Sequence, residues 1–261
     1  MHDINKLPLS KATSNPGTVY ITWQKNLFNL PASFIYFLLS ILLFFINLLC
    51  IPREKYAEIQ NRSQEKETLR RLEDIGDFIK EGETVLDVGC GNGRFGENIA
   101  RKFNACVTGI DVVDYADAGI PIKFYDGYTI PFDDNSFDVI IMAFMLHHVK
   151  HQDVIFKEAL RCSKSKIIIY EDTYFSPWQH LFIMWNDFHS NMIVGLVKIV
   201  KGLEGKGILG MPLPFTFRSV KGWYRYFQEN NLEIISTQVS HSNFKPMSKV
   251  TFLLQKGTRT E

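Results

Sequence analysis

The sequence has few cysteines, and they are far apart. Only four occur in 261 residues, at positions 50, 90, 106 and 162, and none forms a C-x-x-C pair. Disulfide frameworks and cysteine zinc sites usually show paired spacings, so this pattern excludes both as the basis of the fold. Internal repeats and low-complexity tracts are missing as well, while 46% of the residues are hydrophobic. The chain can therefore bury a core and is not a disordered protein.

The sequence also lacks a strong net charge. The formal charge is +1, with 10 basic and 8 acidic residues in 1–80, 9 and 15 in 81–175, and 10 and 5 in 176–261. The acidic middle argues against a nucleic-acid groove, because such grooves neutralise phosphates with lysine and arginine. We therefore expect no nucleic-acid partner. The basic last third is compatible with solvated surface or with contact to phosphate head groups.

One segment lacks charge altogether. No charged residue lies between Asn26 and Pro52, and residues 34–51 are almost wholly apolar. Twenty helical residues span about 30 Å, the thickness of the hydrocarbon core of a bilayer. We expect an N-terminal tail at 1–26, followed by a transmembrane or membrane-associated helix at 27–52. The alternative is a buried helix of the folded domain, although such helices usually keep a polar face.

The flanking charges predict the orientation of this helix. Three lysines precede it, whereas six lysines and arginines follow it within about twenty residues. This asymmetry predicts a membrane-associated protein whose larger domain is cytoplasmic. Ser33, Ser40 and Asn47 recur every seven residues and would form one stripe on the helix. The stripe leaves self-association into a homo-oligomer open, and chance placement explains the spacing equally well.

Beyond residue 81, apolar runs of strand length alternate with helical segments. Strands are predicted at 84–88, 105–111, 137–143 and 166–171, with helices at 94–103 and 153–161. Such alternation indicates right-handed crossovers and a parallel sheet covered on both faces. We predict a doubly wound α/β domain over residues 82–261.

Three further segments complete this organisation. A charged helical neck at 53–81 precedes the domain, and an aromatic, mostly helical insertion at 176–215 interrupts it. A helix at 219–229 and strands at 232–240 and 249–256 are predicted to end the chain.

The most informative local pattern is TVLDVGCGNG at residues 84–93. A hydrophobic strand containing Asp87 leads into glycines at 89, 91 and 93, and a helix follows. Glycine lets the backbone turn tightly and lets a ligand approach without a Cβ in the way. Asp111 ends the second strand, where a carboxylate can accept hydrogen bonds from both hydroxyls of a ribose. The pattern predicts a nucleoside site at the carboxyl edge of the sheet.

Two classes of ligand fit that site. The segment GNGRFG at 91–96 satisfies the G-x-G-x-x-G spacing of dinucleotide-binding folds, which would imply a nicotinamide cofactor and hydride transfer. Asp87 argues against this, because an anion beside the loop would repel a pyrophosphate and suits a cationic ligand. The segment YDGYTIPFDDNSFDV at 125–139 adds a third acid, Asp126, after the third strand.

The order of these motifs resembles that of class I S-adenosylmethionine-dependent methyltransferases, in particular those with a small-molecule or lipid acceptor. The shared features are h-x-x-D-x-G-x-G-x-G, an acid after the second strand, D-G-x-x-x-P-F-x-D-x-S-F-D and L-H-H-V, over about residues 80–172. The resemblance implies a Rossmann-like seven-stranded sheet with an antiparallel last strand. It also implies S-adenosylmethionine as the cofactor. Residues 1–80 and 176–215 lie outside the resemblance.

The resemblance also implies which residues contact the cofactor. Asp87 and the loop of Gly89, Cys90, Gly91 and Gly93 would hold the methionine part, Asp111 with Val112 the ribose, Asp126 with Gly127 the adenine edge, and Phe144 the pocket floor. Two features depart from the family pattern: Val112 replaces a small polar residue, and SKSK at 163–166 replaces a frequent Pro-Gly-Gly turn. Neither departure removes a cofactor contact.

Methyl transfer needs few catalytic side chains, because the positive charge of the sulfonium donor disappears in an in-line displacement. Alignment in a water-poor pocket supplies most of the rate enhancement, and a base is needed only if the acceptor loses a proton. His148 and Glu171 follow strands four and five and are the candidate catalytic bases. Loop shaping, helix capping and acceptor binding are the alternatives. No metal site is predicted, because the spacings match no ligand pattern.

The insertion at 176–215 presents a broad apolar surface. Such helices close a site over a hydrophobic acceptor, lie in a membrane interface or pack in a core. Together with residues 27–52, it leads to the hypothesis that the pocket faces a bilayer. The substrate would be small and hydrophobic or lipid-like, such as a quinone precursor, a polyprenyl compound or a modified lipid. The alternatives are a non-catalytic methyltransferase-like membrane adaptor and a nicotinamide-dependent oxidoreductase.

Overall fold

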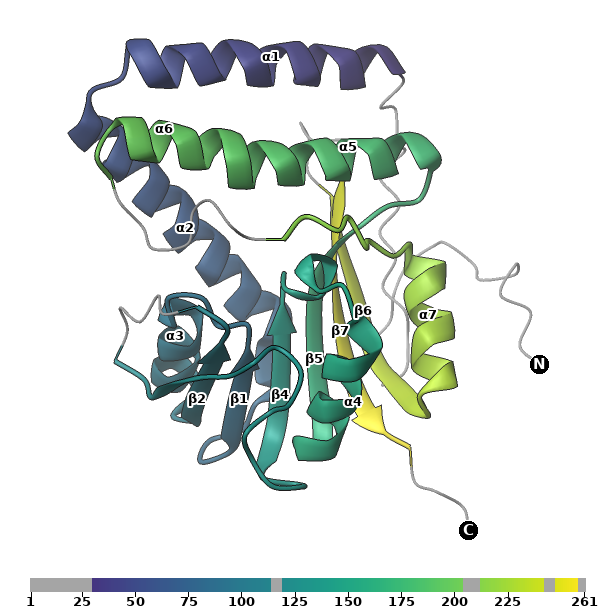
Figure 1. Cartoon of the computed structure of the whole chain (residues 1–261). Helices are drawn as coiled ribbons and strands as arrows, with labels where there is room; N and C mark the ends of the chain where they lie inside the picture. Colours follow the sequence, from purple (N-terminus) through teal and green to yellow (C-terminus); the bar gives the residue numbers. More distant parts are fainter. Residues whose placement is uncertain (1–29, 114–118, 204–211, 242–246, 258–261) are drawn as a thin grey trace.

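Seven strands form one mixed sheet in the order β3-β2-β1-β4-β5-β7-β6 (Figure 1). The computed structural model describes residues 30–113, 119–203, 212–241 and 247–257. Within them the strands are β1 (Thr84–Val88), β2 (Cys106–Asp111), β3 (Ile122–Phe124), β4 (Phe137–Ala143), β5 (Ser163–Thr173), β6 (Leu232–His241) and β7 (Ser248–Lys256). Strands β1 to β5 are parallel, and β7 runs antiparallel between β5 and β6. The predicted seven-stranded sheet with an antiparallel last strand is confirmed.

Helices cover both faces of this sheet. They are α2 (Arg53–Ile75), α3 (Arg94–Phe103), α4 (Gln152–Cys162) and α7 (Val220–Glu229), with short 3-10 helices η2 (Gly76–Phe78) and η3 (Leu146–His148). Because successive side chains of a strand point to opposite faces of the sheet, β1 contributes side chains to the core on both faces. Val85 packs with Leu72 of α2 and Ile99 of α3, whereas Leu86 packs on the face covered by α4 and α7.

A separate helical cover lies beyond the carboxyl ends of the parallel strands (Figure 1). It consists of α1 (Leu30–Leu49), α5 (Pro177–Phe188), the π-helical turn η4 (His189–Ile193) and α6 (Val194–Val200). Trp185 of α5 joins the two layers of helix: its Nε1 donates to Ser40 Oγ at 3.1 Å, and its ring lies 4.5 Å from that of Phe37. Lys201 Nζ donates to the carbonyl of Leu48 at 3.2 Å, at the end of α1.

The predicted transmembrane helix at 27–52 is not supported. The helix α1 does form there, but among the described residues no helix is both long and apolar enough to cross a bilayer. The sequence interpretation weighed the length, the hydropathy, the flanking charges and the missing polar face of this segment, none of which shows what covers the helix. In the structure, one side of α1 packs on α5 and α6 through Ser40 and Phe37, so part of its surface is used within the chain. The predicted tail at 1–26 lies outside the described residues.

Most predicted elements agree with the structure to within one to three residues at each end. The strand predicted at 166–171 is longer, at 163–173, because it pairs with β4 from Ser163 to Tyr170 and with β7 from Lys166 to Thr173. The charged neck is helical over 53–75 and then tightens into η2. The domain boundaries proposed from the sequence stay predictions.

Truncation of Phe156 tests the packing of α4 between the sheet and α7. Phe156 is fully buried, 4.8 Å from the ring of Tyr226 and 6.4 Å from that of Phe227. Phe156→Ala is expected to lower the free energy of unfolding by about 3–5 kcal/mol, because it loses buried apolar surface and leaves a cavity. Urea denaturation followed by circular dichroism measures the loss. The exposed Val154→Ala on the same helix should change it by at most about 0.5 kcal/mol, and equal losses would contradict this packing.

Candidate active site

The glycine loop lies at the carboxyl end of β1 and turns directly into α3. Gly89, Gly91 and Gly93 all have positive φ, at 70°, 57° and 78°. A Cβ on Gly89 would come within 2.8 Å of the Cβ of Met145, so only glycine fits there. Gly89 N donates to the carbonyl of Ile110 at 2.8 Å, which ties the loop to the end of β2.

Asp111 completes this attachment. Its Oδ2 accepts from Gly91 N at 2.8 Å, and its Oδ1 accepts from Val113 N at 3.1 Å. The loop is thereby held beside the end of β2, as the predicted ribose site requires. Burial raises the pKa of Asp111, and the backbone hydrogen bonds from Gly91 and Val113 oppose that shift. Cys90 packs beneath the loop, where a Cβ on Gly109 would meet its Sγ.

Asp87 is a buried acid, and one of its two carboxylate oxygens accepts no hydrogen bond. It is 2% exposed, and its Oδ2 has no hydrogen-bond partner. Burial raises its pKa to about 7, Arg71 acts in the opposite direction, and the nearby Asp111 raises it further. A buried carboxylate of this kind is costly unless a cation pairs with it. Asp87 therefore provides a site for a positively charged group beside the glycine loop.

Asp126 follows the end of β3. It is exposed, and its Oδ1 accepts from Tyr128 N at 2.8 Å and Thr129 N at 2.7 Å, which lowers its pKa. A Cβ on the neighbouring Gly127, whose φ is 82°, would lie 3.2 Å from Val112. The ends of β2 and β3 thus bring Val112, Asp126 and Gly127 together, as expected for one side of a nucleoside pocket.

Phe144 follows β4 with a φ of 53°. Its ring carries two cations: the guanidinium carbon of Arg71 lies 4.5 Å and Lys249 Nζ 4.8 Å from the ring centroid. The ring of Phe144 therefore lies beside Arg71, the arginine that also acts on Asp87. The role of Phe144 as the pocket floor stays a prediction.

Arg71 is a residue that the sequence interpretation treated only as a flanking positive charge. It reaches from α2 into the domain, with its guanidinium carbon 5.4 Å from the ring of Phe95 and 5.7 Å from that of Tyr170. Its Nε has no hydrogen-bond partner and lies 3.7 Å from Glu67 Oε1. In the sequence, Arg71 could be recognised only by its place next to apolar residues of α2 such as Leu72 and Ile75. That place does not distinguish a buried arginine from an exposed one.

The two candidate bases occupy one buried cluster. Glu171 Oε1 accepts from Leu146 N at 2.8 Å, and its Oε2 lies 2.5 Å from His147 Nδ1. Both oxygens of Glu171 are thus engaged in holding η3, which favours a positioning role over that of a free base. Burial lowers the pKa of His147, but Glu171 outweighs it and raises the pKa to about 9.

His148, the other candidate, is adjacent but has a different environment. Burial and the charge of His147 lower its pKa to about 4, so it is neutral at pH 7. Its Nδ1 lies 3.0 Å from the carbonyl oxygen of Pro212, and its Nε2 lies 3.7 Å from Asp187 Oδ1 of α5. The helical cover therefore touches the cluster through Asp187.

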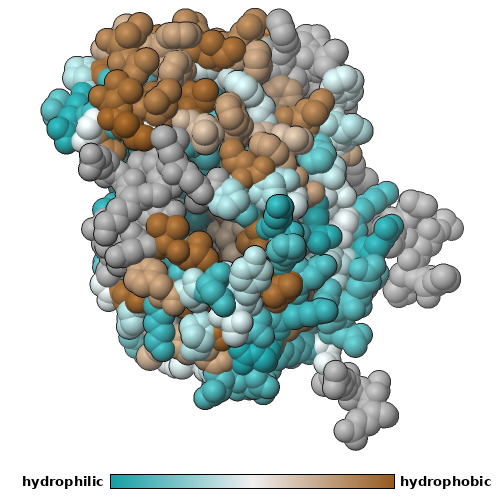
Figure 2. All heavy atoms as spheres, in the orientation of Figure 1, coloured by the Kyte–Doolittle hydropathy of each residue, from teal (hydrophilic) through white to brown (hydrophobic). Residues whose placement is uncertain are grey.

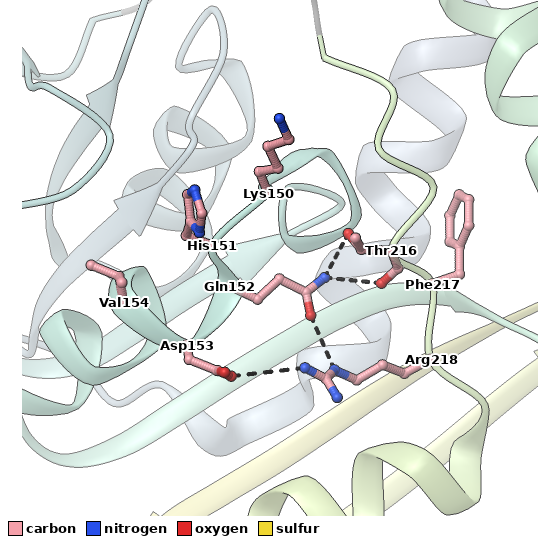
Figure 3. A pocket seen from close by; sticks show the side chains of 8 residues that line it. All are labelled: Lys150, His151, Gln152, Asp153, Val154, Thr216, Phe217 and Arg218. Carbon is pink, nitrogen blue, oxygen red and sulfur yellow. Dashed lines mark hydrogen bonds and ion pairs between the residues drawn. The ribbon is translucent and has the colours of Figure 1, made fainter.

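A pocket of about 450 Å³ lies next to this cluster (Figure 3). Gln152 organises its wall: its Nε2 donates to the carbonyl of Thr216 at 2.9 Å, and its Oε1 accepts from Arg218 Nε at 3.0 Å. Phe217 connects the pocket with the histidine cluster. It lines the pocket, and its ring stacks on that of His147 with the ring centroids 4.7 Å apart. The eight lining residues are Lys150, His151, Gln152, Asp153, Val154, Thr216, Phe217 and Arg218.

This geometry has a counterpart among known protein families. Residues 86–170 match the family model described as a methyltransferase domain. The chain contains a class I methyltransferase domain. The match includes the glycine loop, Asp111, Asp126, Phe144 and the histidine pair. S-adenosylmethionine is the cofactor that this domain uses, and the nicotinamide alternative raised by the glycine spacing is not supported.

Part of this chain is similar in sequence to part of several curated methyltransferases. Phosphoethanolamine N-methyltransferase 2 of Caenorhabditis elegans is 27% identical over 117 residues, 40% of this chain and 26% of that protein. Sterol 24-C-methyltransferase ERG6B of Gibberella zeae is 32% identical over 125 residues, 43% of this chain and 32% of that protein. The ubiquinone/menaquinone biosynthesis C-methyltransferase UbiE of Chromobacterium violaceum is 27% identical over 127 residues, which are 43% of this chain and 51% of that protein. The chain thus spans about a quarter to a half of these relatives.

A solved structure supports the fold independently. The YcgJ protein of Bacillus subtilis aligns with a TM-score of 0.53 and 12% identity, over 74% of this chain and 99% of that one. At this identity the likeness concerns the arrangement of strands and helices.

The methyltransferase domain fits its cofactor on two observations. The loop at Gly89 to Gly93 leaves open space beside Gly91, and the buried Asp87 Oδ2 lacks a partner. S-adenosylmethionine carries an ammonium and a sulfonium, so it brings the positive charge that Asp87 requires. The roles given to the individual contact residues stay predictions.

The affinity for S-adenosylmethionine should depend on pH through Asp87. Below about pH 7 the carboxyl takes up a proton and no longer attracts the ammonium, so affinity should fall by up to about tenfold per pH unit on acidification. Above pH 7 the affinity should level off, until the amino group of the ligand loses its proton near about pH 8. Calorimetric titration from pH 5 to pH 9 measures this dependence.

A matched pair of variants tests the assignment. Asp87→Asn should weaken binding by about 1.5–3 kcal/mol and remove the acidic slope. Asp126→Asn should keep the slope, because the backbone hydrogen bonds hold its pKa below the usual range. A slope that persists in Asp87→Asn would show that another group titrates.

Proposed function

We propose that the protein transfers the methyl group of S-adenosylmethionine to a small hydrophobic acceptor at the surface of a membrane. The observation that carries the first part is the buried, unpartnered oxygen of Asp87 beside a glycine loop in a methyltransferase domain. Asp87 holds the ammonium of the methionine part, and Arg71, whose guanidinium lies over Phe144, pairs with the carboxylate at the same end. Asp111 holds the ribose, and Asp126 with Gly127 lies at the adenine edge.

The helical cover supports a hydrophobic acceptor. Asp187 of α5 meets the histidine pair at the carboxyl end of β4, so the cover closes the edge of the sheet where the methyl group is transferred. The pocket in Figure 3 adjoins the same histidines and provides room for the acceptor. His148, neutral at pH 7, accepts the proton if the acceptor is a phenol or hydroxyl, and Glu171 orients the loop.

The outer surface of the cover supports a membrane partner. Figure 2 shows hydrophobic residues gathered over α1, α5 and α6. The large exposed apolar side chains there are Ile35, Leu38, Leu39, Ile41, Leu42, Leu43, Phe45, Ile46 and Leu49 of α1, and Trp178, Leu181, Phe188, Met192, Leu196, Ile199 and Val200 of α5, η4 and α6. Apolar patches of this extent are rare on proteins without a binding partner. We propose that α1 lies on the bilayer with α5 and α6 and that the domain faces the cytoplasm.

The relatives bear on the class of acceptor. A sterol and a ubiquinone or menaquinone precursor appear in the names of two of them, and phosphoethanolamine in the name of a third. Those names describe the other proteins. For this chain the apolar cover favours the hydrophobic class, with a quinone precursor, a polyprenyl compound or a modified lipid as substrate. Self-association stays a prediction, and Ser40 of the proposed stripe is already bonded to Trp185.

The activity is tested with a labelled methyl donor. The purified protein is incubated with S-adenosylmethionine carrying a trideuterated methyl group and a total lipid extract, and mass spectrometry locates the label. Label is expected in the organic phase. Asp111→Ala should lower the rate at limiting donor about ten- to a hundredfold, because a hydrogen bond to a charged group is lost. Glu58→Ala, which removes a carboxylate from ion pairs on the surface of α2, should leave the rate unchanged. Label only in water-soluble products would contradict the lipid acceptor.

Membrane association is tested by flotation with phospholipid vesicles. The protein should float with the vesicles at high salt, since apolar burial drives the binding. The double variant Leu42→Asp/Leu181→Asp, at positions 55% and 56% exposed on the cover, should remain in the soluble fraction. Leu69→Asp, 53% exposed on α2, should still float. Loss of flotation in Leu69→Asp, or its persistence in the double variant, would contradict the assignment of the cover as the membrane contact.

A further inference from the structure

We infer that His147, His148 and Asp187 form a binding site for a divalent transition-metal ion. One ligand atom from each of these side chains lies within 4.8 Å of the other two. The histidines stand in η3 at the carboxyl end of β4, and the aspartate comes from α5 in the helical cover. Residues 147 and 187 are far apart in sequence, which is why their spacing matches no ligand motif and no metal site was predicted.

The distances within the cluster fit ligands better than hydrogen-bond partners. His147 Nε2 lies 3.8 Å and His148 Nε2 lies 3.7 Å from the same oxygen, Asp187 Oδ1. Both separations exceed the range of a hydrogen bond. Around a tetrahedral zinc ion with bonds of about 2.0–2.1 Å, neighbouring ligand atoms stand roughly 3.3 Å apart. A movement of a few tenths of an ångström would bring each histidine nitrogen to that spacing from Asp187 Oδ1.

The other nitrogen of each imidazole is already engaged. His148 Nδ1 lies 3.0 Å from the carbonyl oxygen of Pro212, which can only accept, so Nδ1 carries the proton and Nε2 the lone pair. His147 Nδ1 faces the Glu171 carboxylate at 2.5 Å, so its Nε2 is likewise the atom directed at Asp187. Metal-ligating histidines typically donate their second N–H to a carboxylate or a backbone carbonyl in this way. A bound ion takes the place of any proton on His147 Nε2 and occupies the lone pair of His148 Nε2, so His148 accepts a proton from the substrate only when the site holds no ion.

Asp187 supplies the independent observation that a cation belongs here. Its side chain is 6% exposed, and its Oδ2 is buried without a hydrogen-bond partner. The other oxygen accepts from Asn191 Nδ2 at 2.6 Å, which orients the carboxylate. An ion bound at Oδ1, the oxygen that faces the histidines, would neutralise this buried carboxylate and so offset the cost of its burial.

The donor set indicates the class of ion. Two imidazole nitrogens and one carboxylate oxygen suit zinc, iron, cobalt or nickel, whereas magnesium and calcium prefer oxygen alone. Three protein ligands leave at least one coordination position open. Because Asp187 belongs to the cover and the histidines to the sheet edge, the ion would fasten the cover to the methyltransferase domain.

Zinc binding by the full chain tests this site. The protein is stripped with a chelator, and Zn²⁺ is titrated in competition with a chromophoric chelator. One ion per chain is expected. Asp187→Asn and His148→Ala should each weaken zinc binding by at least about tenfold, since removing a second-shell partner alone costs about 10–100-fold. His151→Ala, an exposed histidine nearby outside the cluster, should leave the affinity unchanged.

Two further measurements separate this inference from folding and from the proposed activity. Calorimetric titration with S-adenosylmethionine reports whether each variant is folded, and Co²⁺ bound to the wild-type protein should show the intense visible bands of a low-coordinate histidine site. Absence of stoichiometric zinc in the wild type, Co²⁺ bands identical to those of the aqueous ion, or equal losses in His151→Ala and Asp187→Asn would each overturn the metal site. None of these readouts depends on methyl transfer.

Discussion

The parallel pairing of β1 with both β2 and β4 is the constraint on which the site depends. Parallel strands end at the same edge of a sheet, so the residues that follow them meet in space however far apart they are in sequence. Asp111 at the end of β2 therefore reaches the loop that follows β1 and bonds to Gly91 N. The histidine pair follows β4 at the same edge. Reversal or displacement of β1 would separate these groups.

The segments outside this central sheet complete the site from two directions. On one side, α2 inserts Arg71 beside Asp87 and Phe144, and Lys249 of β7 and Glu67 of α2 form an ion pair next to it. On the other side, α5 brings Asp187 to the histidines. The glycine-loop region and the histidine cluster thus each contact one helix from outside residues 86–170, the portion that matches the methyltransferase domain.

Sequence periodicity was reliable wherever local geometry decides the outcome. The apolar runs of β1 and β4, the glycines that need positive φ, and the acids that end strands are properties of short segments, and the structure contains all of them. The interpretation was less reliable for long-range burial. A mostly apolar helix of twenty residues such as α1 has the same sequence signature whether lipid or α6 covers one side, and Ser40 finds its partner, Trp185, 145 positions away.

By itself the sequence determined the class of fold and the position of the cofactor loop, because strand period, glycine placement and terminal acids act through neighbouring residues. Only the tertiary structure decided which charged groups share a buried space. Arg71 next to Asp87, Glu171 bonded to His147, and Asp187 facing both histidines depend on how strands and helices pack across long stretches of chain. Charge and burial at those positions are set by neighbours in space, and the order of residues along the chain does not specify them.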